Sequence, residues 1–207
     1  MINATNLEFY VQHRKEERYL EYKCSMMWTG EDVTKVKVAK AMMAMANLRN
    51  GGVVVIGMKE ITKGVWESDD MTVQQVMSFS HDDIAQWVND YAVPAVQFTV
   101  EPFMLDKNRF VIIQVREFDS FPTICRKQKT LGGREALRPG AIYYRSNRKN
   151  ESAPISSEED MRELIKLAAD KGVAREVKRL HELGLVATEL ELQKRSTLKF
   201  EEEREGL

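Results

Sequence analysis

The segment from Ala46 to Gly57 constrains the fold more than any other part of the sequence. Apolar residues recur at helical spacing before it, which predicts a helix over about 32–48. Asn and Gly at 50–52 can take the left-handed backbone that ends a helix. The β-branched run at 53–56 follows at once and is typical of a strand buried on both faces. A helix followed directly by a buried strand indicates an α/β or α+β domain.

Further elements of both kinds follow along the chain. The patterns predict strands at 19–23, 96–104, 109–116, 121–125 and 141–145, and helices at 72–91 (with a break at 78–80), 158–170 and 173–182. Gly172 is expected to separate the last two helices. The prediction is therefore an α+β domain over 1–170, with a mixed sheet packed by helices, followed by a helical C-terminal extension over 171–207.

Composition narrows the class of protein. With 207 residues, of which 43% are hydrophobic, the chain can build one domain with a real core. No apolar run approaches the roughly 20 residues needed to cross a bilayer, and the N-terminus has no apolar signal region. Two cysteines, Cys24 and Cys125, cannot form a disulfide scaffold, and the three histidines are scattered. We expect a cytoplasmic protein with reduced cysteines and no membrane partner.

Charge is unevenly distributed, although the net charge is only −1. Residues 64–106 contain no Lys or Arg and carry Glu67, Asp69, Asp70, Asp82, Asp83, Asp90, Glu101 and Asp106. Residues 126–149 contain one acid, Glu135, among Arg126, Lys127, Lys129, Arg134, Arg138, Arg145, Arg148 and Lys149. A basic face can bind phosphates while an acidic face repels them. The Gly132-Gly133 pair predicts a mobile basic loop, which either binds nucleic acid or is a solvated edge.

Other motifs have competing interpretations. Glu16, Glu17 and Glu21 could supply oxygen ligands to Mg²⁺, or could form solvated surface pairs. Gly52 to Lys59 looks like a phosphate-binding loop, but its lysine comes one residue late and the residues between the glycines favour a strand. Tyr143 and Tyr144 could stack a base or pack in the core. The residues expected to pack in the core are Met42, Met43, Met45, Trp28, Trp66 and Trp87.

Three motifs occur in a recognisable order: Leu20-Glu21-Tyr22-Lys23, then Ala46-Asn47-Leu48-Arg49-Asn50-Gly51-Gly52 with its strand, then Gly140-Ala141-Ile142-Tyr143-Tyr144-Arg145. In this order they resemble the Schlafen AlbA-like DNA-binding domain family over about 16–167. The resemblance implies an α+β domain that binds DNA or RNA.

Some Schlafen proteins are metal-dependent endoribonucleases that act on transfer RNA, with two glutamates five residues apart and an aspartate after the buried strand. The resemblance places the glutamates at Glu16 and Glu21, which would hold Mg²⁺ or Mn²⁺. The aspartate position falls on Lys59, which cannot ligate a metal, with Glu60 beside it. In a continuing strand Glu60 would point to the opposite face.

Three functions remain open. The first is a nucleic-acid-binding module whose contacts are Lys35, Lys37, Lys40, Arg126, Lys127, Lys129, Arg134, Arg138, Arg145, Arg148 and Lys149. The second is a divalent-metal endoribonuclease whose catalytic residues are Glu16, Glu21 and Glu60. The third is a protein-interaction subunit that docks a partner through the acidic 64–106 segment or the tail; a homodimer is also expected. A position of Glu60 away from Glu21 would favour the binding module.

Overall fold

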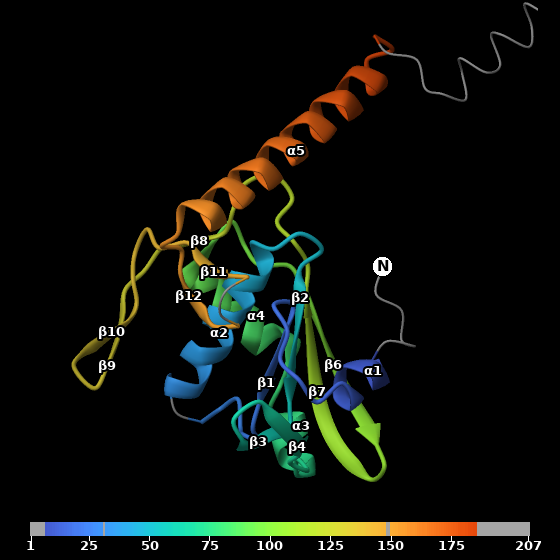
Figure 1. Ribbon diagram of the computed structural model, residues 1–207, viewed down its shortest axis with the longest axis vertical. Coiled ribbons are helices and arrows are strands. Elements are labelled where there is room, and N and C mark those ends of the chain that lie inside the picture. Colours follow the sequence, from blue (N-terminus) through green and yellow to red (C-terminus); the bar gives the residue numbers. More distant parts are fainter. Residues whose placement is uncertain (1–6, 31, 148–149, 186–207) are drawn as a thin grey trace, which may run out of the picture. The chain divides into compact units, whose positions relative to one another are not determined.

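A four-stranded mixed sheet in the order β1-β2-β7-β6 runs through the first part of the chain (Figure 1). Its strands are β1 (Leu20–Lys23), β2 (Gly52–Ile56), β7 (Asn108–Val115) and β6 (Phe98–Leu105). β1 pairs parallel with β2, whereas the other neighbours are antiparallel. This computed structural model describes residues 7–30, 32–147 and 150–185. The mixed α+β fold confirms the class predicted from the sequence.

Helices cover both faces of this sheet. On one face, α2 (Asp32–Ala46) packs against the side chains of β2 and β7 that include Val54 and Ile113. On the other, α1 (Leu7–Gln12) packs against the alternate side chains, including Tyr22 and Val53. The second half of α2 is buried on all sides, because it also contacts β11 (Tyr143–Arg145) and β12 (Ser152–Pro154). The three helix methionines are completely buried, which confirms their core role: Met42, Met43 and Met45.

The junction between α2 and β2 depends on a buried amide and a close backbone approach. Asn47 Nδ2 donates to the carbonyls of Thr123 (2.9 Å) and Tyr143 (3.0 Å), and its Oδ1 accepts from Thr123 N (2.7 Å). Gly51 has a φ of 73°, and a Cβ placed there would lie 2.0 Å from the Val115 carbonyl oxygen. The Ala46–Gly52 motif is therefore structural: it ties the end of the helix to Thr123 and to Tyr143 of β11.

Short strand pairs and helices complete this part. They are β3 (Met58–Thr62) with β4 (Val65–Ser68), the helices α3 (Val73–Met77) and α4 (His81–Tyr91), and β5 (Ala92–Val93) with β8 (Ile124–Cys125). The predicted break at 78–80 is confirmed. Asp106 and Lys107 have φ of 49° and 74°, which suits a two-residue turn between β6 and β7. The predicted strand over 121–125 is reduced to the two residues of β8.

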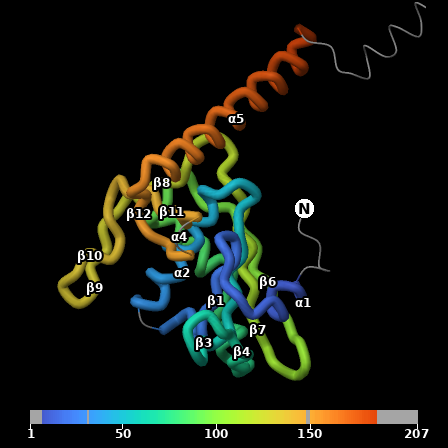
Figure 2. The backbone as a smooth tube through the Cα atoms, in the orientation of Figure 1, coloured from blue at the N-terminus to red at the C-terminus, as the bar shows by residue number. Residues whose placement is uncertain are grey.

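The basic segment is a β-hairpin rather than the predicted loop. β9 (Lys129–Leu131) pairs antiparallel with β10 (Arg134–Leu137), and the hairpin lies beside α2 (Figure 2). Gly132 and Gly133 form its turn with φ of 54° and 75°. The two glycines thus make the tight turn that a twisted hairpin requires, because both central residues need positive φ.

The last helix, α5 (Glu158–Glu182), continues through Gly172, so the predicted interruption is wrong. One helical glycine costs only about 1 kcal/mol relative to alanine, and the helix-forming residues around it offset this. Ser157 caps the helix by accepting from Asp160 N at 3.1 Å. The contacts divide the chain into two compact units, with the boundary after Ile165, within α5. No helix in the described ranges is long and apolar enough to cross a membrane.

Candidate functional site

Glu21 lies at the centre of a buried charge network. Its side chain is only 8% exposed, and Arg145 Nη1, at 0% exposure, donates to its Oε2. Ser152 Oγ donates to the same oxygen at 2.9 Å, and Lys23 Nζ donates to Oε1. The remaining Arg145 N–H groups donate to the backbone carbonyls of Arg18 (2.8 Å), Glu17 (3.0 Å) and Leu20 (3.4 Å). Both oxygens of Glu21 are therefore held by cationic side chains of the protein itself.

This network corrects the prediction that Arg145 contacts nucleic acid. Its guanidinium is completely buried, and the donors named above are used inside the protein. A side chain in this position cannot reach a phosphate on the surface. The residue belongs to the core because Glu21, from a strand far away in the sequence, compensates its charge.

Glu16 lies beside this network. Its Oε1 accepts a hydrogen bond from Tyr22 N at 3.0 Å. Burial raises the pKa of Glu16, and the neighbouring Glu21 carboxylate raises it further, while the Tyr22 N–H, Lys23 and Arg145 act in the opposite direction. The two glutamates identified by the resemblance are thus close enough for the charge of Glu21 to act on Glu16.

Glu60 does not join them. It is exposed on β3, and its Oε1 accepts from Gly64 N at 2.7 Å within the β3–β4 turn. Glu60 pairs in register with Trp66, whose ring lies 5.3 Å from the Tyr22 ring. Tyr22 and Glu21 are successive residues of one strand and point to opposite faces, so Glu60 lies on the face away from Glu21.

The three acids therefore do not fit a divalent cation. Glu21 is held by Arg145 and Lys23, Glu60 lies on the other face, and Lys59 is exposed on β3 opposite Glu67. Over residues 7–30, 32–147 and 150–185 there is no cluster of three or more His, Cys, Asp or Glu side chains able to hold a metal ion. A hard cation such as Mg²⁺ needs several converging oxygen ligands, and this arrangement does not supply them.

Side chains of α2 and of the basic hairpin segment meet at two places. Lys129 Nζ of the hairpin lies 2.5 Å from Asp32 Oδ2 at the start of α2. Lys40 Nζ lies 5.7 Å from the centre of the Tyr143 ring, and the Tyr143 hydroxyl accepts from Arg138 N at 3.1 Å. We use the name α2–hairpin surface for a set of basic side chains that are all exposed or half-exposed: Lys35, Lys37, Lys40, Arg126, Lys127, Lys129, Arg134 and Arg138.

The expected separation of acidic and basic faces is not complete. Arg126 Nε donates to the Asp90 carbonyl at 2.8 Å, and Arg126 Nη2 lies 3.3 Å from Asp90 Oδ1. Lys127 Nζ donates to the same carboxylate oxygen and holds the pKa of Asp90 below its usual value. The end of the acidic segment is therefore attached to the start of the basic one.

Other predicted contacts have different outcomes. Tyr143 and Tyr144 are both buried, so they pack in the core rather than present a face for a base. The Tyr144 hydroxyl accepts from Arg18 Nη2 at 2.7 Å. Arg148 and Lys149 lie outside the described residues.

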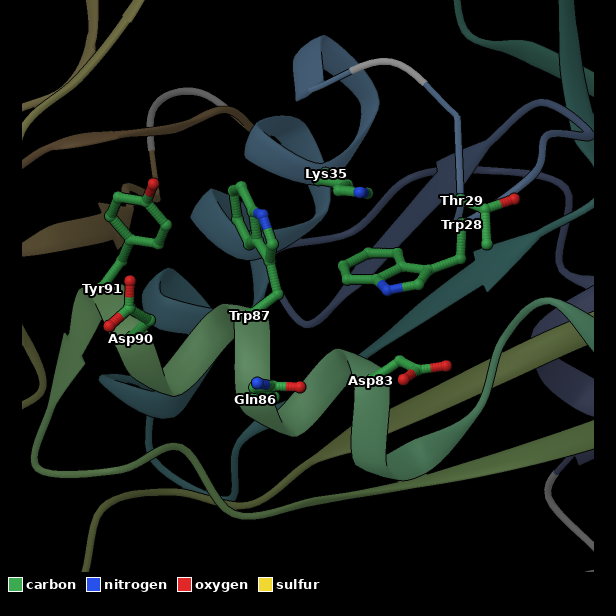
Figure 3. A pocket seen from close by; sticks show the side chains of 8 residues that line it. All are labelled: Trp28, Thr29, Lys35, Asp83, Gln86, Trp87, Asp90 and Tyr91. Carbon is green, nitrogen blue, oxygen red and sulfur yellow. The ribbon is translucent and has the colours of Figure 1, made fainter.

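A pocket that sequence reasoning missed lies between α4 and the start of α2 (Figure 3). Its volume is about 650 Å³, and it is lined by Trp28, Thr29, Lys35, Asp83, Gln86, Trp87, Asp90 and Tyr91. Five of these come from one face of α4, where positions three and four residues apart are neighbours. Trp28 is buried as predicted, but Trp87 is only partly buried and lines the pocket. The helical spacing of the α4 residues is the sequence feature that could have indicated this pocket.

Two solved structures show a distant likeness. The DIP2311 protein of Corynebacterium diphtheriae has a TM-score of 0.43 and 13% identity over 70% of this chain, which covers 23% of that protein's chain. The N-terminal domain of a putative ATP-dependent DNA helicase RecG-related protein from Nitrosomonas europaea has a TM-score of 0.41 and 17% identity, over 76% of this chain and 97% of that one. No curated protein matches.

The comparison with protein families agrees with the motif order and with the fold. The family described as Schlafen, AlbA_2 matches residues 16–154, which is more than half of the chain. The match contains the β1 glutamate, the α2–β2 junction and the strand of Arg145. This chain is a member of the Schlafen AlbA_2 family.

Proposed function

We propose that the protein binds DNA or RNA through the α2–hairpin surface. The observation that carries the proposal is the 2.5 Å ion pair between Asp32 and Lys129, which joins two basic segments that are far apart in the sequence. Membership of the Schlafen AlbA_2 family supports a role connected with nucleic acid.

The electrostatics of the surface favour a phosphate backbone as ligand. Two acids next to these lysines and arginines, Asp32 and Asp90, are each engaged with a basic side chain, whereas Glu135 of β10 is exposed beside Arg134. The contacts lower the pKa of both carboxyls, mainly through hydrogen bonds from Lys129 and Lys127, respectively. The remaining cations face solvent, where they can replace the counterions of a nucleic acid.

The experiment is a salt titration of binding with labelled single-stranded RNA, single-stranded DNA and duplex DNA. We expect log Kd to change linearly with log salt, with a slope of about 0.7–0.9 per neutralised phosphate. Lys37→Ala and Arg134→Ala should each weaken binding and lower the slope by about one contact, because both side chains are exposed on the α2–hairpin surface.

Lys107→Ala is the matched control. Lys107 is an exposed lysine in the β6–β7 turn, outside the α2–hairpin surface. Its removal should leave affinity and slope unchanged. Absence of binding at low salt, or an equal loss in the control, would contradict the proposal.

The alternative of a Mg²⁺- or Mn²⁺-dependent endoribonuclease has less support. Glu16 and Glu21 are close, but Glu21 is held by Arg145 and Glu60 lies on the other face. Incubation of transfer RNA with the protein and Mn²⁺ tests it. Discrete fragments that disappear in Glu21→Gln would restore the enzyme hypothesis.

A further inference from the structure

The pocket described above opens beside the α2–hairpin surface and shares Lys35 with it. Arg126 connects the two regions, because its backbone N donates to the Tyr91 carbonyl at 2.8 Å and its Nε donates to the Asp90 carbonyl. Both carbonyls belong to the last turn of α4, where a cation is favourable. A chain of phosphates on the basic surface would therefore pass directly along the rim of the pocket.

The apolar part of the pocket consists of three aromatic rings. Trp87 and Tyr91 have ring centres 4.8 Å apart, and Trp28 meets Trp87 edge-on at 6.2 Å. Trp28 is held in place, because its backbone N donates to Ser78 Oγ at 2.9 Å and its ring contacts Phe79. Trp87 and Tyr91 are only partly buried. Their accessible surface can stack against a flat ligand, as aromatic side chains do with unpaired bases.

The polar part offers both acceptors and donors. Asp83 and Gln86 are exposed on the same face of α4, three residues apart. In Figure 3 they lie below the two indole rings, with Lys35 on the opposite side of the gap between Trp28 and Trp87. A carboxylate accepts from amino and ring N–H groups, and an amide both donates and accepts. The edge of a nucleobase presents this combination of groups.

A cationic ligand fits this pocket less well, although aromatic rings with carboxylates can bind quaternary ammonium groups. Lys35 lines the pocket and would repel a cation, and Lys127 and Arg126 already engage Asp90. A base within a duplex cannot enter, because its edge is paired and its faces are stacked. The pocket therefore suits an unpaired base next to a phosphate better than it suits a cation or a paired base.

We propose that the pocket lined by Trp28, Lys35, Asp83, Gln86, Trp87 and Tyr91 receives one unpaired base of a single-stranded DNA or RNA segment. The phosphates of this segment lie on the α2–hairpin surface, so the inference rests on the proposed function. Trp87 and Tyr91 stack on the base, Asp83 and Gln86 bond its edge, and Lys35 contacts the adjoining phosphate. Consequently the protein prefers single strands to duplexes.

The test compares a fluorescein-labelled 12-nucleotide single strand that contains all four bases with its duplex, by anisotropy at several salt concentrations. Trp87→Leu should weaken single-strand binding by about 5- to 150-fold, the usual effect of one lost base–aromatic stack. The salt slope should stay unchanged, since a stacked base releases no counterions. Duplex binding should be weaker than single-strand binding and unaffected by the substitution.

A surface substitution covers the case in which Trp87→Leu disturbs folding. Gln86→Ala removes an exposed side chain of the pocket, and Gln74→Ala removes an exposed glutamine of α3 as its control. We expect weaker single-strand binding in Gln86→Ala alone, with thermal unfolding unchanged in both variants.

The outcomes separate this inference from the proposed function. If Lys37→Ala weakens binding but Gln86→Ala and a folded Trp87→Leu do not, the pocket inference is overturned and the basic-surface proposal stands. Equal affinity for single strand and duplex also overturns the pocket inference. If no oligonucleotide binds at low salt, both proposals are overturned.

Discussion

Replacing Arg145 with methionine should destabilise the protein strongly. Methionine is apolar and similar in length to arginine, so the Glu21 carboxylate stays buried. Of its two cationic contacts, Arg145 and Lys23, the contact with Lys23 remains. Removing one member of a buried ion pair costs about 3–5 kcal/mol, because the other charge is left uncompensated. A domain of this size loses about 2–4 °C in Tm per kcal/mol, so Tm should fall by about 6–20 °C.

Urea unfolding at pH 7, followed by tryptophan fluorescence, measures this effect. The double variant Glu21→Gln/Arg145→Met should be more stable than Arg145→Met alone, because the buried charge is then absent. The change in unfolding free energy of the double variant, minus the sum of the changes in the two single variants, gives the coupling energy between the two residues.

Arg162→Ala is the control, since Arg162 forms an ion pair with Glu158 in which both side chains are 78% exposed. Such a surface pair should change stability by no more than about 0.5 kcal/mol. If Arg145→Met costs no more than Arg162→Ala, or if the double variant shows no coupling, the buried charge network does not stabilise the fold as argued.

Three further substitutions test the site and the junction. Glu16→Gln should become more stable relative to the wild type as the pH rises above 4.5, the ordinary pKa of a glutamate, because burial raises the pKa of Glu16 in the folded chain and its ionisation then opposes folding. A difference in unfolding free energy that does not change with pH, measured by urea unfolding, would contradict this. Gly51→Ala should lower Tm far more than Gly133→Ala: both glycines have positive φ, but a Cβ at Gly51 would lie 2.0 Å from a backbone carbonyl oxygen, whereas a Cβ at Gly133 meets nothing within 4 Å. Equal Tm values of the two variants would refute the steric argument. Asn47→Ala should cost at least about 1–3 kcal/mol in urea unfolding, because the Thr123 N–H loses its buried acceptor; an unchanged midpoint would show that water replaces the amide.

Local chemistry explains which parts of the fold could be predicted. The end of α2, the buried β2 and the β6–β7 turn each depend on residues within a few positions of one another. The uninterrupted α5 was missed because neighbouring helix formers outweigh one glycine. The hairpin at 129–137 was missed because its strands have only three and four residues, too few for an alternating pattern.

The candidate sites depend on longer connections. Glu21 and Arg145 are 124 positions apart, so their separate interpretations as a metal ligand and a phosphate contact gave no sign of the ion pair between them. The aromatic pocket combines Trp28 with a face of α4 more than fifty residues later. Only the helical spacing within α4 could have suggested that its polar and aromatic residues share one face.

The ion pair between Asp32 and Lys129 makes the α2–hairpin surface itself sensitive to ionic strength. The side chains are 43% and 25% exposed, so dissolved salt screens their attraction. As salt rises, this contact between the hairpin and α2 weakens, although Leu137 keeps the base of the hairpin in the core, while counterions also compete for the phosphates of a bound nucleic acid. A steep salt dependence therefore overestimates the number of phosphate contacts. Crosslinking the hairpin to α2 would make the salt dependence of nucleic-acid binding less steep without adding any contact to the nucleic acid.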